Sequence, residues 1–180
     1  EHTDAAPPLA FELIAGGRSN LTFRVTDTAG GAWVLRRPPT GHVLATAHDM
    51  GREHRIISAL APTDVPVAPV VGLCEDDSVN GAPFYVMDFV DGLVIRDQAV
   101  ATEVPVEVRR AAGMSLAATL AKIHAVDPDA VGLGELGRKE GYIARQLKRW
   151  NGQFEQATDR EVPEVTTAYE RLLEHIPEQG

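Results

Sequence analysis

The sequence predicts an α+β protein with two lobes, in which a five-stranded sheet and one helix are followed by helices alone. Residues 21–26 alternate in character, with Leu21, Phe23 and Val25 on one face, which is the period of a strand. Paired glycines and prolines interrupt the first part of the chain at short intervals, as turns between strands do. After Pro105 the apolar residues recur every three or four positions instead, which indicates helices.

The predicted strands are short, and each ends at turn residues. They cover residues 9–14, 21–26, 33–37, 69–74 and 84–90. Residues 16–20 and 28–31 are rich in glycine and polar side chains and are expected to be turns. Pro38 follows the third strand and stops it, because proline has no N–H for a strand ladder. A polar turn at residues 75–81 joins the last two strands.

One helix is predicted between the third and fourth strands, at residues 46–60, with Thr46 as its N-cap. Three more follow Pro105, the last two at residues 140–155 and 163–176. The stripe residues expected to face inward are Met50, His54, Ile57 and Leu60, then Val108, Ala112, Leu116, Leu120 and His124, then Ile143, Leu147, Trp150 and Phe154, and finally Val165, Tyr169, Leu172 and Ile176. The predicted organisation is an N-lobe at 1–91, a hinge at 92–104 and part of a helical C-lobe at 105–180.

Composition excludes several classes of partner. The net charge of −9 leaves no basic excess for a nucleic-acid backbone, so no nucleic acid is expected. No apolar run reaches the roughly 20 residues of a membrane helix, so no membrane is expected either. Cys74 is the only cysteine, which rules out an internal disulfide or a cysteine zinc cluster and favours a small buried side chain. We expect a reducing, cytoplasmic location.

The turn Gly16-Gly17-Arg18-Ser19-Asn20 follows the first predicted strand. Rossmann and P-loop fingerprints both open a helix, whereas the segment after this turn alternates as a strand, and no Gly-Lys-Ser/Thr is present. A dinucleotide-binding domain would require residues 21–26 to be helical. Two interpretations stay open: an ordinary hairpin turn, or a glycine-rich turn whose backbone N–H groups cover nucleotide phosphates.

A cation and a carboxylate stand in the order that a kinase N-lobe requires. Arg36 lies on the third strand and Glu53 on the following helix, where such a pair holds the α- and β-phosphates. Each residue also has a simpler interpretation, as a solvated edge cation and a surface carboxylate. Arg52 and Arg55 flank Glu53, so the sequence leaves the partner of Glu53 undecided.

The segment from Tyr85 to Gly92 has the character of a hinge between lobes, because an apolar strand runs into Asp-Gly. Adenine would be bound there by the backbone around Phe89. The Asp88 carbonyl and the Val90 N–H are the expected contacts, with Met87 behind the ring. The alternative is a buried strand followed by a turn.

Together these segments resemble the aminoglycoside phosphotransferase family, and within it the branch fused ahead of some acyl-CoA dehydrogenases. The resemblance covers nearly the whole chain and rests on residues 14–23, 33–39, 52–60, 84–92 and 120–127. It implies a protein-kinase-like fold, ATP with Mg2+, and transfer of the γ-phosphoryl group to the hydroxyl of a small molecule. Arg36 stands where many members carry Lys. Arg is always charged and forks its donors, which is compatible with phosphate binding in an altered geometry.

The resemblance also implies a His-Gly-Asp segment, whose Asp acts on the acceptor hydroxyl, and a later Asp that holds magnesium. None of the six histidines is followed by Gly-Asp. We therefore expect the catalytic Asp and the metal ligands downstream of Gly180, and we assign no catalytic or metal-binding residue to this segment. We expect it to be part of a longer enzyme, inactive alone and partnered by the remainder of its own C-lobe. The alternative is a non-catalytic, pseudokinase-like nucleotide-binding module.

In the family, helices beyond the hinge form the substrate side of the cleft. Tyr142, Arg145, Arg149 and Trp150 are therefore candidates for substrate contact. The competing interpretation places Trp150 in the helical core and the arginines on a solvated face. Sugars, amino alcohols and hydroxyacyl thioesters all remain open as acceptors.

Overall fold

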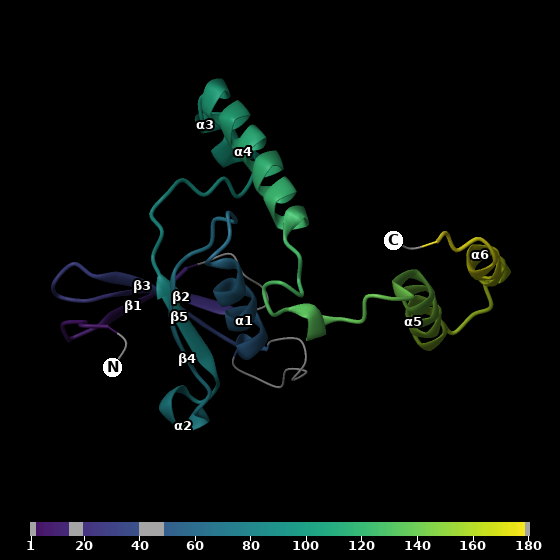
Figure 1. Ribbon diagram of the computed structural model, residues 1–180, viewed down its shortest axis with the longest axis horizontal. Helices are drawn as coiled ribbons and strands as arrows, with labels where there is room; N and C mark the ends of the chain where they lie inside the picture. The colour runs from purple at the N-terminus through teal and green to yellow at the C-terminus, as the bar shows by residue number, and fades with distance from the viewer. Residues whose placement is uncertain (1–2, 15–19, 40–48, 179–180) are drawn as a thin grey trace. The chain divides into compact units, whose positions relative to one another are not determined.

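A computed structural model describes residues 3–14, 20–39 and 49–178, and the structural statements below concern these residues. The chain divides into two compact units, Glu1–Leu133 and Gly134–Gly180, which are described separately. Figure 1 labels the elements along the chain. The predicted organisation into 1–91, 92–104 and 105–180 remains a prediction, since compactness of the chain alone does not define functional lobes.

The first unit contains one antiparallel sheet. Its strands are β1 (Ala10–Leu13), β2 (Leu21–Thr26), β3 (Ala32–Arg37), β4 (Val70–Cys74) and β5 (Phe84–Asp88). Their order in the sheet is β1-β2-β3-β5-β4, with every neighbouring pair antiparallel. This confirms the predicted five-stranded sheet. The last strand ends at Asp88 rather than at the predicted Val90.

The strand register sets one row of side chains across the sheet. Thr22 lies opposite Arg36, and Arg36 lies opposite Tyr85. Because paired residues in antiparallel strands point to the same face, the three side chains share one face of the sheet. Helix α1 (Met50–Leu60) packs against β4 and β5. The sheet and α1 together bring residues distant in sequence into one place (Figure 1).

Helix α1 begins later than the sequence predicts. Asp49 is the N-cap, and its carboxylate accepts a hydrogen bond from the backbone N–H of Arg52 at 2.9 Å. The predicted start at residue 46 with Thr46 as the cap is therefore wrong, although Thr46 itself lies outside the described residues. Asp49 satisfies N–H groups that a first helical turn leaves without partners, which fixes the start there.

Two short helices form where the sequence predicts turns or linkers. Helix α2 (Asp77–Asn80) lies within the predicted turn at 75–81 and ends at Gly81, whose φ of 71° is left-handed. Helix α3 (Gln98–Glu103) lies within the predicted hinge. In both cases an aspartate side chain, Asp76 or Asp97, caps the first turn.

The later helices follow the predicted order with shifted ends. They are α4 (Val106–Ala125), the 3-10 turn η1 (Gly134–Leu136), α5 (Tyr142–Ala157) and α6 (Pro163–Glu174). None of them reaches the length and apolar character of a membrane-crossing helix, and neither do the other described helices.

Several side chains predicted to face inward are instead exposed. Helix α4 has no buried residue, and Leu116 is 72% exposed. Trp150 on α5 and Leu172 on α6 are also exposed, and Ile176 lies beyond the end of α6. Periodicity describes the spacing of apolar residues alone, whereas burial also needs a neighbour that packs against them.

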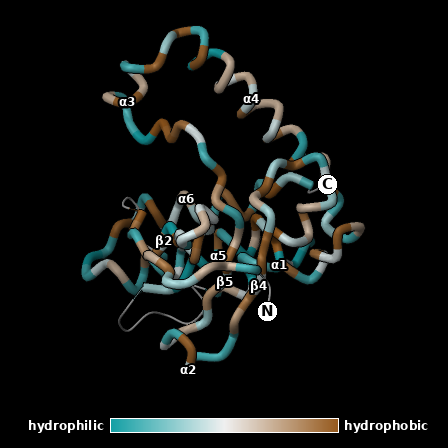
Figure 2. The backbone as a smooth tube through the Cα atoms, turned by 90° about the vertical axis from the view of Figure 1, so that its left-hand side faces the viewer, coloured by the Kyte–Doolittle hydropathy of each residue, from teal (hydrophilic) through white to brown (hydrophobic). Residues whose placement is uncertain are grey.

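The core of the first unit lies between α1 and the sheet. Tyr85 and Met50 are its largest fully buried side chains, and Val34 is buried with them. Apolar stretches mark β4 and β5 in Figure 2. The opposite face of the sheet carries Phe23 and Leu35, which line an open hollow of about 440 Å³.

The turn between β2 and β3 is organised by Asp27. Its carboxylate accepts backbone hydrogen bonds from Ala6, Ala29 and Gly31 at 2.9, 3.0 and 2.6 Å. These bonds, that from Ala6 first, lower the pKa of Asp27 below its ordinary value. Gly30 has a φ of 89°, which favours glycine, and a side chain on Gly31 would displace the Trp33 ring.

We predict that Asp27→Ala lowers the Tm of the protein at pH 7, because three backbone donors lose their acceptor. A carboxylate with a lowered folded pKa stabilises the fold above its unfolded pKa, and this contribution is lost as the pH falls through the folded value. The difference in Tm between wild type and variant should therefore shrink below about pH 4. Thermal unfolding from pH 2 to 7 measures it, with the exposed Asp4→Ala as the control. A constant difference across this range would contradict the assignment.

Candidate functional site

The centre of the candidate site is an ion pair between Arg36 on β3 and Glu53 on α1. The Arg36 Nε donates to Glu53 Oε2 at 2.7 Å. The two side chains are 31% and 32% exposed, so the pair is sheltered but can be reached by a ligand. The hydrogen bond from Arg36 to Glu53 raises the pKa of Arg36 above its ordinary value, which keeps the guanidinium charged. The sequence left the partner of Glu53 undecided, and the structure pairs it with Arg36.

The Glu53 carboxylate also accepts hydrogen bonds from two neutral side chains. Asn20 Nδ2 donates to Oε1 at 2.8 Å, and the Tyr85 hydroxyl donates to Oε2 at 3.2 Å. Both Glu53 oxygens are therefore held, one by Asn20 and the other by Arg36 and Tyr85. Residues from three strands or strand ends thus converge on one helical carboxylate.

The orientation of Arg36 suits an anion. Its Nε is bound to Glu53, and its Nη1 donates to Thr22 Oγ1 at 3.1 Å. A guanidinium carries five N–H donors in a plane, and these two bonds leave further donors on the terminal nitrogens. Paired terminal N–H groups match the oxygens of a phosphate, so Arg36 fits the predicted phosphate-binding role chemically.

Tyr85 combines a buried ring with a polar function. It is 2% exposed, and its ring meets the His54 ring edge to face at a centroid distance of 6.3 Å. Burial, followed by the negative charge of Glu53, raises the pKa of Tyr85 to about 12. The hydroxyl therefore stays protonated at neutral pH and acts as a donor to Glu53.

Most of the predicted glycine-rich turn lies outside the described residues. This applies to Gly16, Gly17, Arg18 and Ser19, so their role over phosphates stays a prediction. Asn20, the last residue of the turn, is buried at 6% exposure, and its amide contacts Glu53. The end of the turn is thus bonded directly to α1.

The predicted adenine-binding backbone follows β5. The Asp88 N–H donates to Pro69 O at 2.8 Å, and the Phe89 N–H donates to Ala32 O at 3.4 Å. These two donors serve the sheet, which leaves the predicted Asp88 carbonyl and Val90 N–H as the groups to consider for adenine. Met87 lies on the same face of the sheet as Arg36, by the register of β3 with β5.

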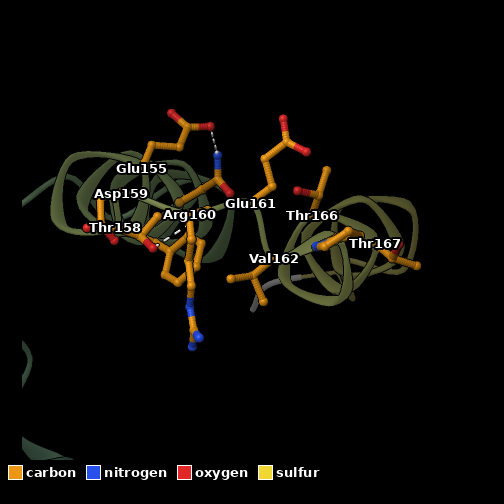
Figure 3. Close-up of a pocket in the computed structure, with 11 residues that line it drawn as sticks. Glu155, Thr158, Asp159, Arg160, Glu161, Val162, Thr166 and Thr167 are labelled. Atoms are coloured by element: carbon orange, nitrogen blue, oxygen red, sulfur yellow. Dashed lines mark hydrogen bonds between the residues drawn. The ribbon is translucent and has the colours of Figure 1, made fainter.

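The second unit has its own open hollow, of about 620 Å³, between α5 and α6 (Figure 3). In Figure 3 the side chains of Glu155 and Glu161 point to the top of the view and that of Arg160 points to the bottom. The residues that line it are Asn151, Phe154, Glu155, Thr158, Asp159, Arg160, Glu161, Val162, Pro163, Thr166 and Thr167. The predicted substrate residues are all absent from this lining.

The four predicted substrate residues lie elsewhere on α5. Tyr142 and Trp150 are 53% and 59% exposed, so the alternative that placed Trp150 in the core is wrong for this unit. Arg145 donates to the backbone carbonyls of Glu140 and Arg138, which anchors the start of α5. Arg149 is exposed. Their predicted contact with a substrate remains a prediction.

The described residues hold no cluster of three or more side chains of the metal-binding types His, Cys, Asp and Glu. Cys74 is partly buried and carries a free thiol.

Three residues of the site were not predicted from sequence. Tyr85 and Thr22 flank Arg36 across the sheet, and the Arg24 guanidinium lies 4.6 Å from the centre of the Phe89 ring. Strand alternation placed Thr22 and Arg24 on one face of β2. The missing information was the strand register, which sets these side chains beside Arg36 and Phe89.

We predict that Tyr85 titrates above the ordinary range of a tyrosine, because its hydroxyl is buried beside Glu53. A phenol with a raised folded pKa stabilises the fold fully below the unfolded pKa of about 10, and this contribution is lost as the pH rises through about 12. Tyrosinate absorbance should show a late component that Tyr85→Phe removes. An absorbance titration without a component near pH 12, or with one that persists in Tyr85→Phe, would contradict this environment.

The chain is similar to a known protein family and to several known proteins. The model of the phosphotransferase enzyme family matches residues 10–180. Acyl-CoA dehydrogenase family member 10 of mouse is 34% identical over 98% of this chain and 16% of its own length. The human family member 11 is 33% identical over 94% of this chain and 22% of its own. The chain thus spans about a fifth or less of these relatives.

A solved structure of similar fold comes from Ralstonia eutropha. This protein, provisionally named an aminoglycoside phosphotransferase, is 35% identical with a TM-score of 0.77, over 98% of this chain and 50% of its own. The likeness confirms the predicted kinase-like α+β fold. With the family match over nearly all of the sequence, it shows that this chain belongs to the phosphotransferase enzyme family.

Proposed function

We propose that this chain provides the nucleotide-binding part of an ATP-dependent phosphotransferase that transfers the γ-phosphoryl group to the hydroxyl of a small molecule. The observation that carries the proposal is the Arg36–Glu53 ion pair, held at 2.7 Å on one face of the sheet. Family and fold support a kinase-like enzyme. The proposal adds the nucleotide, the direction of transfer and the roles of individual residues.

Each residue of the site has a defined task in this proposal. Arg36 binds phosphate oxygens through its terminal nitrogens, and Glu53 fixes the direction in which they point. The backbone of Asp88 and Val90 binds the adenine edge. In phosphoryl transfer, catalysis consists mainly of positioning and of stabilising charge. Bound magnesium would neutralise charge on the phosphates.

The names of the relatives suggest which acceptor to test first. Two of them are named as acyl-CoA dehydrogenase family members. If a phosphotransferase is fused to an acyl-CoA dehydrogenase, a hydroxyacyl thioester is an acceptor whose phosphorylated product both parts of the protein could use. We therefore rank hydroxyacyl thioesters ahead of sugars and amino alcohols as the acceptor class.

We predict that Arg36→Ala in the full-length protein weakens ATP binding by about tenfold or more, since charge-assisted bonds to phosphate are lost. Arg37→Ala is a matched control, because Arg37 neighbours Arg36 on β3 but bonds to Asn80 near the opposite face. Calorimetric titration with ATP measures both variants. Wild-type affinity in Arg36→Ala would refute the assigned role.

A second prediction concerns catalysis. The full-length protein with ATP and magnesium should release ADP faster when a hydroxyacyl thioester is added. The same thioester without its hydroxyl should not increase the rate of ADP release. A coupled ADP assay across the three acceptor classes measures this. ATP binding with no acceptor-dependent ADP release would favour the non-catalytic module instead.

A further inference from the structure

The hydroxyl of Tyr85 meets the ion pair at its centre. It donates to Glu53 Oε2 at 3.2 Å, and the same oxygen accepts Arg36 Nε at 2.7 Å. Tyr85 also lies directly opposite Arg36 in the register of β3 and β5. Its ring is 2% exposed and packs against His54, so the hydroxyl is held in place by the core.

Glu53 needs such support, because a glutamate side chain has several rotatable bonds and loses entropy when it is fixed. Arg52 and Arg55 lie one and two positions away on the same helix and are alternative partners by charge. Arg55 is instead bonded to Gly132 O at 2.6 Å. Tyr85 on one oxygen and Asn20 on the other fix the plane of the carboxylate.

The plane of the carboxylate in turn sets the guanidinium. The Nε bond to Oε2 defines one edge of the Arg36 plane, and Thr22 Oγ1 accepts from Nη1 at 3.1 Å. A rotation of the carboxylate would rotate the terminal nitrogens of Arg36 as well. Any group that fixes Glu53 therefore acts on the direction in which Arg36 can bind an anion.

We propose that Tyr85 is a positioning residue for the nucleotide phosphates, which acts through Glu53 on Arg36. This inference rests on the proposed function, since it assigns Arg36 to phosphate. Tyr85 is suited to the task because it is a neutral donor, so it orients the carboxylate without competing for the phosphate charge. The raised pKa keeps its hydroxyl protonated over the physiological range.

The test compares ATP with adenosine, which has the same base and ribose but no phosphates. Tyr85→Phe removes the hydroxyl and keeps the buried ring, so the fold is expected to persist. Calorimetry on the full-length protein should show ATP binding weakened about fivefold and adenosine binding unchanged. Tyr169→Phe, on α6 in the other unit, is the matched control and should bind both ligands like wild type.

The Arg36→Ala background separates positioning from general damage. If Tyr85 acts through Arg36, adding Tyr85→Phe to Arg36→Ala should cause no further loss of ATP affinity. Unchanged ATP affinity in Tyr85→Phe alone would overturn the inference while the proposed function stands. An equal loss of adenosine affinity in Tyr85→Phe would also overturn the inference, because it would indicate general damage to the site. A further loss of ATP affinity in the double variant would overturn it as well, because Tyr85 would then act independently of Arg36. Full ATP affinity in Arg36→Ala would refute the proposed function and the inference together.

Discussion

The Glu53 carboxylate is the interaction on which the candidate site depends. It accepts hydrogen bonds from Arg36, Tyr85 and Asn20, which come from β3, β5 and the residue before β2. An ion pair of two flexible side chains at a protein surface contributes little by itself. Here hydrogen bonds from Asn20 and Tyr85 offset the entropy that the Glu53 side chain loses when it is ordered. The result is a cation of fixed direction, which is what binding a phosphate requires.

Local sequence patterns were enough for the outline of the fold. Alternation in residues 21–26 identified β2, and proline after Arg37 marked the end of β3. The order of a strand cation and a helix carboxylate was also sufficient to select Arg36 and Glu53. These features depend on residues close together in sequence, or on the order of elements, and both can be read from a single chain.

The remaining features depend on register, caps and packing partners. Tyr85 joins the site only because β5 pairs with β3 in one register, which the sequence of neither strand specifies alone. The start of α1 was misplaced because Thr46 and Asp49 are both acceptable caps by residue type. The spaced apolar residues of α4 were expected to be buried, but they are exposed. Periodicity shows only which residues share a helix face, and burial also needs a neighbour that covers this face.

Tyr85 contributes both to the packing of the sheet and to the polar contacts of the candidate site. The same side chain fills the space beneath α1 and ends in the hydroxyl that contacts Glu53. Changes at this position that spare the fold must keep a large flat ring, and among the natural residues few offer both that shape and a donor at its tip. Among the polar groups around the ion pair, the half-buried Thr22 is therefore easier to change without loss of packing than Tyr85 or the buried Asn20.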